Sequence, residues 1–346
     1  MSLQSKLGQL FICGFKGLDP RDPALKPLFE NIEEGLIGGL IFFGYNIQEK
    51  NQLQDLIGTI KALKAPFPLF LSVDQEGGRV QRLSSKNGFQ DGLSAFAVAE
   101  KFSPEEAYQY YQEQAAVLQE VGLNLTFAPV VDVHSDQSPV IGAYGRSFGT
   151  EPETVVVYGR SFIKAHQDKG ILTCLKHFPG HGLALADSHA GLVDITETWQ
   201  ERELEPYKAL IQENLTDFVM TGHLWHRKWH KDLPAAFQRE KITALLKQEL
   251  KFKGLVITDD LAMGAIQQNY TINDALILSL TSGHDLLLYS FNQAASPEAK
   301  TLVESHDSRR YLNNLVLEAV QSGRLSEEQI NSSYDRILET KKKISV

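Results

Sequence analysis

Eight short apolar runs, separated by longer amphipathic segments, constrain the fold of this chain more than any other feature of its sequence. Most are nearly continuous in apolar residues rather than alternating, which is typical of strands buried on both faces of a helix-covered parallel sheet. The runs are Gln9–Gly14, Gly39–Phe43, Pro68–Val73, Leu125–Val133, Ile171–His177, Asp217–His223, Gly254–Thr258 and Asp285–Tyr289. Their alternation with helices predicts a closed (β/α)₈ TIM barrel, with a doubly wound open sheet as the alternative.

Helix signals occupy the segments between the runs. Ser103 is suited to cap a helix that continues with Pro104 and two acidic residues, and Ser326 and Gln329 have the spacing of a capping box. The predicted helices are Ser103–Val121, Glu151–Lys169, Thr198–Glu213, Arg239–Lys251, Ile272–Ser282, Ala299–Gln321 and Ser326–Lys343. No linker-like or low-complexity segment interrupts the pattern, so residues 1–346 are expected to form one barrel domain with C-terminal helices at about 299–343.

Charge and cysteine usage narrow the setting in which the chain works. The formal net charge is −9, and the one cationic run, Lys341–Lys343, suits a solvated helix end, so no nucleic-acid partner is expected. No apolar run reaches about 18 residues, and the first residues lack the pattern of a signal peptide, so no membrane partner is expected either. Cys13 and Cys174 lie in apolar runs and are expected to be buried thiols. We therefore expect a cytoplasmic setting. The sequence leaves the oligomeric state open, and we take a monomer as the starting expectation.

Polar residues follow the apolar runs at five consecutive strands. In a barrel the active site lies at the C-terminal strand ends. The third to seventh runs lead into "SVDQEGGRVQR", "FAPVVDVHSD", "LKHFPGHG", "VMTGHLWH" and "VITDD". This repeated placement of charge directly after apolar strands indicates a site at one end of the barrel.

Two parts of this pattern carry candidate acid and base groups. Asp259 follows the seventh strand directly; because neighbouring strand residues point to opposite sides, we expect Asp259 in the site and Asp260 to cap the following segment. Asp187 and His189 would lie on one side of an extended chain, where a carboxylate and an imidazole can exchange protons near neutral pH. By itself the Asp187–His189 spacing also fits a hydrogen bond that only stabilises a loop.

Several other polar residues fit ligand binding or ordinary ion pairing. Arg79, Arg82 and Arg146 can each bind a carboxylate or sugar hydroxyls, and Asp74 can accept two hydroxyl hydrogen bonds. Gly77-Gly78 permits a close backbone approach or a tight turn. The segment "HLWHRKWH" at 223–230 can form an aromatic platform or pack loops together.

Taken together, the motifs resemble those of glycoside hydrolase family three, and within it the compact bacterial β-N-acetylglucosaminidases of cell-wall recycling. The matching strings occur in the family order and span most of the chain. They are "DQEGGRVQRL" at 74–83, "FAPVVDV" at 127–133, "GRSFGTEPE" at 145–153, "KHFPGHG" at 176–182 with "DSH" at 187–189, "VMTGH" at 219–223 and "ITDDLAMGAI" at 257–266. The "KHFPGHG-x4-DSH" string is the most specific of them.

The resemblance implies a barrel hydrolase that removes β-linked N-acetylglucosamine from peptidoglycan fragments with retention, through a covalent glycosyl–enzyme intermediate. It makes Asp259 the nucleophile, His189 the acid/base and Asp187 the partner of that histidine. It places Asp74, Arg82, Arg146, Lys176 and His177 at the sugar-binding positions, and Asp132 in a binding or supporting role. Neither a cofactor nor a metal is expected.

Two departures from the family pattern concern the walls of the site. Leu183-Ala184-Leu185-Ala186 replaces residues that are usually polar, in the loop that carries the acid/base. "GAYGRSFG" replaces a commoner "IGDRSFG"-like string, which brings Tyr144 close to Arg146. Positioning of His189 and the detail of the arginine wall are therefore open.

Four alternatives remain at the level of the sequence. Within the same family, the chain could be a phosphorylase, or a β-glucosidase, although roughly 55 residues after the last strand are few for the usual extra domain. From a different class, His177, His181, His189, His223 and Asp259 could form a metal-dependent hydrolase. The fourth is a barrel that binds sugar without catalysis.

Overall fold

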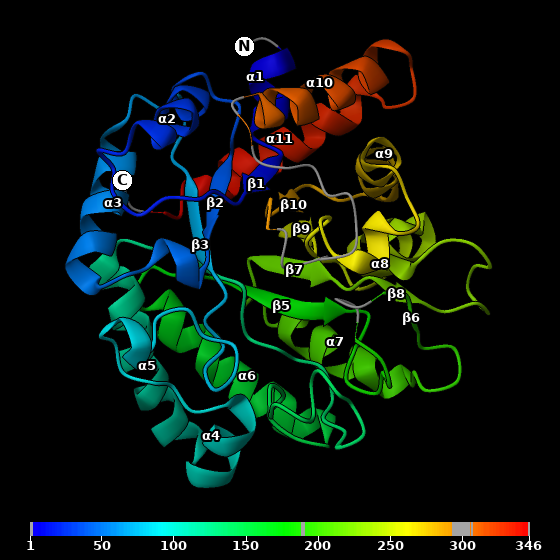
Figure 1. Cartoon of the computed structure of the whole chain (residues 1–346). Helices are drawn as coiled ribbons and strands as arrows, with labels where there is room; N and C mark the ends of the chain where they lie inside the picture. Colours follow the sequence, from blue (N-terminus) through cyan, green and yellow to red (C-terminus); the bar gives the residue numbers. More distant parts are fainter. Residues whose placement is uncertain (1–2, 188–190, 293–304, 306, 345–346) are drawn as a thin grey trace.

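The computed structural model describes residues 3–187, 191–292, 305 and 307–344, and eight parallel strands form its centre (Figure 1). The strands are β1 (Phe11–Cys13), β2 (Gly39–Phe42), β3 (Phe70–Val73), β4 (Leu125–Thr126), β5 (Leu172–Phe178), β7 (Phe218–Thr221), β9 (Leu255–Thr258) and β10 (Leu287–Tyr289). They pair in the order β10-β1-β2-β3-β4-β5-β7-β9. A parallel bridge between Ile257 and Leu286 joins the two ends of this sheet. The predicted closed barrel is thus confirmed, and the open sheet was the wrong alternative.

Seven of the eight apolar runs match their strands closely, whereas the fourth does not. The run at 125–133 predicted a long strand, but β4 ends at Thr126, and only Val130 pairs again, in an isolated bridge with Lys176. Pro129 lies between these two points and has no N–H with which to continue a ladder.

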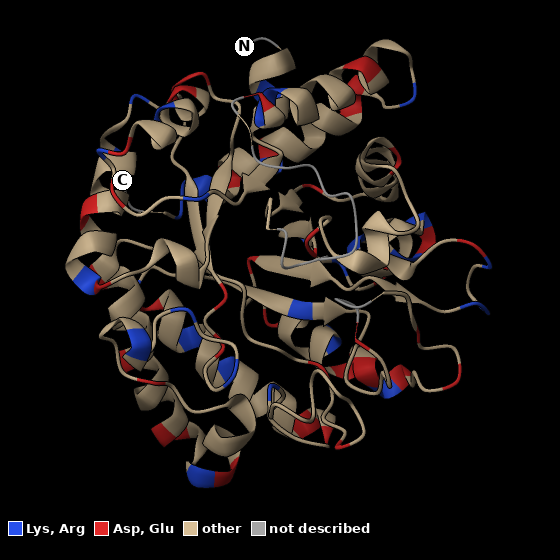
Figure 2. Cartoon of the chain, viewed as in Figure 1, with Lys and Arg blue, Asp and Glu red and all other residues tan. Residues whose placement is uncertain are grey.

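Helices surround the strands, and charges of both signs are interspersed over the helices and loops (Figure 2). The α-helices are α1 (Leu3–Gly8), α2 (Lys26–Glu33), α3 (Lys50–Ala62), α4 (Ala95–Lys101), α5 (Pro104–Val121), α6 (Pro152–Gln167), α7 (Glu205–Gln212), α8 (Gly264–Gln267), α9 (Ile272–Ser282), α10 (Ser308–Gln321) and α11 (Glu327–Lys341). A π-helix spans Glu240–Glu249, and 3-10 helices span Pro23–Leu25, Gly44–Asn46, Ser85–Asn87, Glu201–Leu204 and Ala235–Phe237.

The helix predictions hold where a capping residue marks the start. Ser103 and Glu106 form a capping box at α5, and Ser326 and Gln329 form one at α11. The predicted helix at 198–213 begins later, because a 3-10 turn precedes α7. The predicted start of the helix at 299–321 lies outside the described residues, and α10 begins at Ser308. Helices α1, α2, α3, α4 and α8 were not predicted. The capping positions of α2 and α3 make no side-chain capping bond, whereas Ser94 caps α4.

The N-terminal end of the barrel is closed by α11. Lys341 on this helix is buried, and its Nζ donates to Gln9 Oε1 at 2.7 Å and to the Gly38 carbonyl oxygen at 2.9 Å. The Phe70 ring lies 5.0 Å from Lys341 Nζ and packs edge-on against Phe218 inside the barrel. The polar residues that follow the strands lie at the opposite, C-terminal end of the barrel.

The two cysteines and the helices bear on the expected cellular setting of the chain. Cys13 and Cys174 are buried and form no disulfide, as predicted. Within the described part of the chain, no helix is both long and apolar enough to cross a membrane.

Candidate active site

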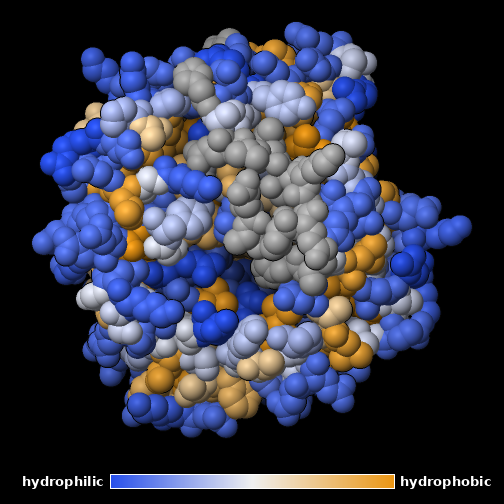
Figure 3. Space-filling model, in the orientation of Figure 1, coloured by the Kyte–Doolittle hydropathy of each residue, from blue (hydrophilic) through white to orange (hydrophobic). Residues whose placement is uncertain are grey.

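A cavity of about 830 Å³ opens at the C-terminal ends of the strands. Figure 3 shows a hollow bordered by hydrophilic side chains near the centre of this face. The cavity is lined by six of the eight predicted site residues, namely Asp74, Arg82, Arg146, Lys176, His177 and Asp259. Asp187 is partly exposed and is not among the residues that line it, and His189 lies outside the described residues.

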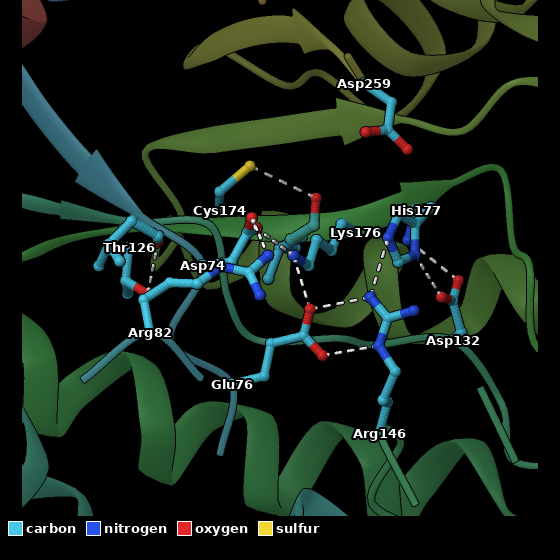
Figure 4. A network of polar contacts seen from close by, with 12 residues as sticks. Asp74, Glu76, Arg82, Thr126, Asp132, Arg146, Cys174, Lys176, His177 and Asp259 are labelled. Atoms are coloured by element: carbon cyan, nitrogen blue, oxygen red, sulfur yellow. Dashed lines mark hydrogen bonds and ion pairs between the residues drawn. The ribbon is translucent and has the colours of Figure 1, made fainter. Parts of the chain in front are cut away.

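Asp259 stands directly after β9, where the sequence placed it. Its backbone N–H donates to the Thr221 carbonyl oxygen at 3.1 Å, which extends the β7–β9 pairing by one residue. Its Oδ1 accepts the N–H of Asp260 at 2.8 Å. Figure 4 shows the carboxylate across from the polar network, on the side of His177. The carboxylate is thus held at the cavity by the end of a strand.

Asp260 also borders the cavity, but its contacts are structural. Its Oδ1 accepts the N–H of Ala262 at 3.0 Å and that of Ser290 at 3.0 Å, so it caps the segment after β9 and ties it to the end of β10. Burial raises the pKa of this carboxyl to about 6, and the neighbouring Asp259 contributes in the same direction. The expected division of roles between the two neighbours agrees with these contacts.

Asp74, at the end of β3, pairs with two cations on the floor of the cavity (Figure 4). Lys176 Nζ on β5 donates to Oδ1 at 3.0 Å, and Arg82 donates to Oδ2 at 3.1 Å. Burial opposes ionisation of Asp74, but Lys176 and Arg82 outweigh it and hold the pKa below its usual value. Asp74 is therefore a fixed carboxylate that can accept hydrogen bonds from hydroxyl groups of a ligand.

Glu76 joins the remaining cations and is the main residue that the sequence reasoning missed. Its two oxygens accept from Arg146 Nε at 2.7 Å and from Arg146 NH2 at 2.8 Å, and Lys176 Nζ lies 2.7 Å from Oε1. Burial works against ionisation, yet Arg146 and Lys176 lower the pKa of Glu76 to about 2. A signal was present: Glu76 is two residues after Asp74, the spacing that puts side chains on one side of an extended chain.

Asp132 organises the end of β5 from the β4–α6 connection. Its Oδ1 accepts the N–H groups of His177 at 3.0 Å and His181 at 2.9 Å, and its Oδ2 lies 2.8 Å from His177 Nδ1. Arg146 NH2, which can only donate, lies 3.4 Å from His177 Nε2, so the ring proton is on Nδ1. Asp132 therefore has the supporting role that its weaker motif match suggested.

The first departure from the family pattern, at 183–186, has a packing reason. Ala184 is buried in a small cluster with Val193, Ile195 and Leu224, and the partly exposed Trp199 packs against it. Val193 and Leu224 belong to a two-stranded sheet outside the barrel, β6 (Val193–Asp194) and β8 (Leu224–Trp225). Leu185 is exposed. An apolar residue at 184 thus anchors this loop to a separate small core.

The second departure places Tyr144 beside Arg79. The Arg79 guanidinium lies 5.6 Å from the centre of the Tyr144 ring, and both residues are exposed.

The glycine pair at 77–78 fits a close backbone approach within the protein, because a Cβ at Gly77 would lie 2.1 Å from the Leu93 carbonyl oxygen.

The aromatic segment at 223–230 packs loops rather than lining the cavity. The rings of His226 and Trp229 stack at 3.9 Å, Lys241 Nζ lies 3.8 Å from the Trp229 ring centre, and Trp199 packs edge-on against Trp229. None of these side chains lines the cavity. Loop packing, one of the two interpretations of this segment, agrees with these contacts.

The histidines proposed for a metal site have other partners where the structure describes them. His177 is bound to Asp132, and His223 Nε2 lies 3.1 Å from the Asp260 carbonyl oxygen. Among the described residues, no group of three or more His, Cys, Asp or Glu side chains is arranged to hold a metal ion. The metal-dependent alternative gains no support from this geometry.

Comparison with known proteins agrees with the motifs. The model of the glycosyl hydrolase family 3 N-terminal domain matches residues 2–340. Beta-hexosaminidase A of Pseudoalteromonas piscicida is 30% identical over 338 residues, which cover 92% of this chain and 55% of that protein. Beta-hexosaminidase of Hydrogenovibrio crunogenus is 33% identical over 315 residues, covering 87% of this chain and 85% of that protein.

A solved structure extends the likeness to three dimensions. The structure of a glycoside hydrolase family 3 β-N-acetylglucosaminidase from Paenibacillus sp. matches with a TM-score of 0.86 at 33% identity, covering 99% of this chain and 62% of that one. The chain therefore belongs to glycosyl hydrolase family 3, which places it in a class of glycoside hydrolases. It spans just over half the length of the first of these relatives and most of the second.

Proposed function

We propose that the chain is a retaining exo-β-N-acetylglucosaminidase that hydrolyses terminal β-linked N-acetylglucosamine from peptidoglycan fragments. One observation carries this proposal: Asp259, at the end of β9, borders the same cavity as the buried network of Asp74, Glu76, Arg146 and Lys176. A reactive carboxylate thus faces a floor built to bind hydroxyl groups. The β-hexosaminidases among the similar proteins support the preference for an amino sugar.

In the first step of this mechanism, the sugar lies against the network while Asp259 attacks its anomeric carbon. The bond to the leaving-group oxygen breaks, and a protonated His189, stabilised by Asp187, donates a proton to that oxygen. Asp74 accepts from sugar hydroxyls, and Arg82, Arg146, Lys176 and His177 complete the sugar-binding wall. The product of this step is an ester between Asp259 and the sugar.

In the second step, His189 takes a proton from water, whose oxygen attacks the anomeric carbon and releases Asp259. Two inversions give net retention. A histidine paired with an aspartate has the near-neutral proton affinity that both directions of transfer need. The roles of Asp187 and His189 follow from the "KHFPGHG-x4-DSH" string.

We place this reaction in the cytoplasm, because both cysteines are buried outside any disulfide, as in a reducing compartment. The chain is proposed to act as a monomer on a small carbohydrate.

The experiment is turnover of aryl β-N-acetylglucosaminides and of a disaccharide with terminal N-acetylglucosamine, followed by NMR of the first-formed anomer. The proposal expects free sugar released as the β-anomer. An α-anomer as first product would refute retention, and accumulation of sugar 1-phosphate in phosphate buffer would make the chain a phosphorylase. A β-glucoside turned over faster than the N-acetylglucosaminide would overturn the amino-sugar preference.

For His189 the leaving group provides the test. The kcat/KM of His189→Ala, which reports on the first step, should fall little with a 2,4-dinitrophenolate leaving group, which needs no protonation, and much more with a sugar leaving group. Equal losses on the two substrates would argue against the acid/base role.

A further inference from the structure

Glu203 is a buried carboxyl group that the mechanism above does not use. It lies on the 3-10 helix Glu201–Leu204, between β6 and α7, and it is 1% exposed. Its Oε2 accepts the N–H of Gly182 at 2.9 Å, and the Leu183 N–H also contributes to the hydrogen bonding of this carboxyl group. The side chain of Glu203, 21 residues further along the chain, thus holds the backbone where the loop leaves β5.

The fit between Glu203 and this loop is tight. Gly180 has a φ of +123°, and a Cβ there would lie 2.5 Å from the Glu203 Cβ. A Cβ at Gly182 would lie 1.8 Å from the Val133 carbonyl oxygen. The two glycines of "PGHG" therefore let the chain pass between Glu203 and the β4–α6 connection, which leaves the backbone little freedom at this point.

Two further contacts fix the same stretch. Asp132 accepts the N–H of His181 at 2.9 Å, and Trp199 Nε1 donates to the Pro179 carbonyl oxygen at 3.0 Å. Residues 179–183 are thus held by three side chains, one from the β4–α6 connection and two from the β6–α7 connection. We name this stretch the loop root, because the chain continues from it through Ala184 to Asp187 and His189.

We infer that Glu203 is a positioning residue: by holding the loop root, it sets the geometry with which the Asp187–His189 pair meets the leaving group. This inference rests on the acid/base role proposed above. Asp132 binds both the loop root and His177, so it cannot serve the loop alone, whereas Glu203 accepts its hydrogen bond from Gly182 in the loop root. Glu203 is therefore the residue through which the loop can be disturbed without touching the sugar-binding network.

The charge state of Glu203 determines the matched substitution. Burial raises its pKa to about 8, and the nearby Asp132 adds to the shift. The titratable and charged groups that interact with it are Asp132, Arg202 and Tyr207. At pH 6.5 the carboxyl is neutral, so a glutamine keeps its size, its acceptor oxygen and its charge.

The test compares Glu203→Ala and Glu203→Gln with Glu201→Ala, an exposed residue of the same short helix that pairs only loosely with Lys208. Hydrogen exchange of the peptide spanning 179–187 reports on the loop root independently of activity. We expect exchange at Gly182 and Leu183 to speed up at least about tenfold in Glu203→Ala, and to stay at the wild-type rate in Glu203→Gln and Glu201→Ala. Unchanged exchange in Glu203→Ala would overturn the inference.

The kinetic arm measures kcat and KM at pH 6.5 with 2,4-dinitrophenyl and phenyl β-N-acetylglucosaminides. Glu203→Ala should lose kcat/KM, which reports on the first step, by roughly tenfold or more on the phenyl substrate beyond its loss on the dinitrophenyl substrate. KM should stay unchanged, and Glu203→Gln should restore the rate. Equal losses on both substrates, or a change confined to KM, would refute positioning.

Two controls keep the outcomes distinct. If Glu203→Ala does not fold, Glu203→Asp shortens the side chain by one methylene; it should show the same selective loss, and its absence would refute the inference. If the wild-type chain turns over no N-acetylglucosaminide, the proposed function fails, while the exchange measurement still decides whether Glu203 holds the loop root.

Discussion

Glu76 and Arg146 form a bidentate pair on the floor of the cavity, with Arg146 Nε 2.7 Å from Oε2 and NH2 2.8 Å from Oε1. Both side chains are buried, and Lys176 completes the carboxylate's surroundings. The pair joins the loop after β3 to the segment before α6, 70 residues apart. It therefore fixes the guanidinium in place before any ligand arrives.

Replacing Glu76 by Gln should lower the free energy of unfolding by about 3 kcal/mol or more, because buried Arg146 loses its bidentate carboxylate partner and Lys176 keeps Asp74 but loses Glu76. KM should rise as the guanidinium loses its orientation. The matched control is Glu213→Gln, which removes a bidentate partner of Arg160 on the surface; it should cost at most about 1 kcal/mol. Urea denaturation measures both, and equal costs would contradict the central role given to the buried pair.

Acid should destabilise the fold through buried histidines. Burial lowers the pKa of His166 and His181 to about 4 and that of His284 to about 3, below the usual value near 6.5. Between pH 6.5 and about 4 the unfolded chain takes up protons that the folded chain refuses, so stability falls as pH falls. Each such proton changes the unfolding free energy by about 1.4 kcal/mol per pH unit.

His166→Phe provides the check on this account. His166 stacks on Phe162 at 4.0 Å, so a phenyl ring fits the environment. The variant should show a shallower loss of stability between pH 6.5 and 4 than the wild type, by up to one proton. An identical slope would mean that His166 takes up its proton in the folded state.

Asp132→Asn should lower kcat/KM by roughly ten- to a hundredfold, because one charge-assisted hydrogen bond to His177 is worth about 1.5–3 kcal/mol. The amide also cannot accept at both of the carboxylate's oxygens. Asp136→Asn is the control, because Asp136 is exposed and pairs with His134 outside the network. Asp136→Asn should leave kcat/KM unchanged. A wild-type kcat/KM in Asp132→Asn would show that Asp132 does not support His177 in the reaction.

The sequence predicted the parts of this fold that depend on local pattern. Seven strands lie within apolar runs and β5 extends one residue beyond its run, because burial on both faces requires continuous apolar residues. The capped helices α5, α9 and α11 were predicted, whereas α2 and α3 lack a side-chain cap and were missed, and α4 was missed although Ser94 caps it. The strand at 125–133 was predicted too long because its apolar residues stay buried after the pairing ends at Thr126.

The residues of the candidate site also differ in how far local sequence pattern could predict them. Asp74 and Asp259 could be predicted because they follow strands directly, and Lys176 and His177 because they end one. Glu76 carried a signal in its spacing from Asp74 that was not used, whereas Glu203 could not be recognised, since its importance comes from a partner 21 residues away. His189 lies outside the described residues, so its role stays a prediction from the motif.

Asp259 provides the most direct test. Its replacement by Asn should leave the unfolding free energy close to wild type and reduce kcat by at least roughly a thousandfold, whereas Asp260→Ala should mainly destabilise the protein by releasing the N–H groups of Ala262 and Ser290.

The decisive measurement is mass spectrometry of the protein quenched with acid during turnover of 2,4-dinitrophenyl β-N-acetylglucosaminide by the His189→Ala variant, in which the second step is slowed. The account predicts one added N-acetylhexosaminyl group on the peptide that contains Asp259, and its loss when Asp259 is also replaced by Asn. An adduct on Asp260 or another residue would contradict this account. So would the absence of any adduct while the variant turns over substrate at a rate that the second step limits.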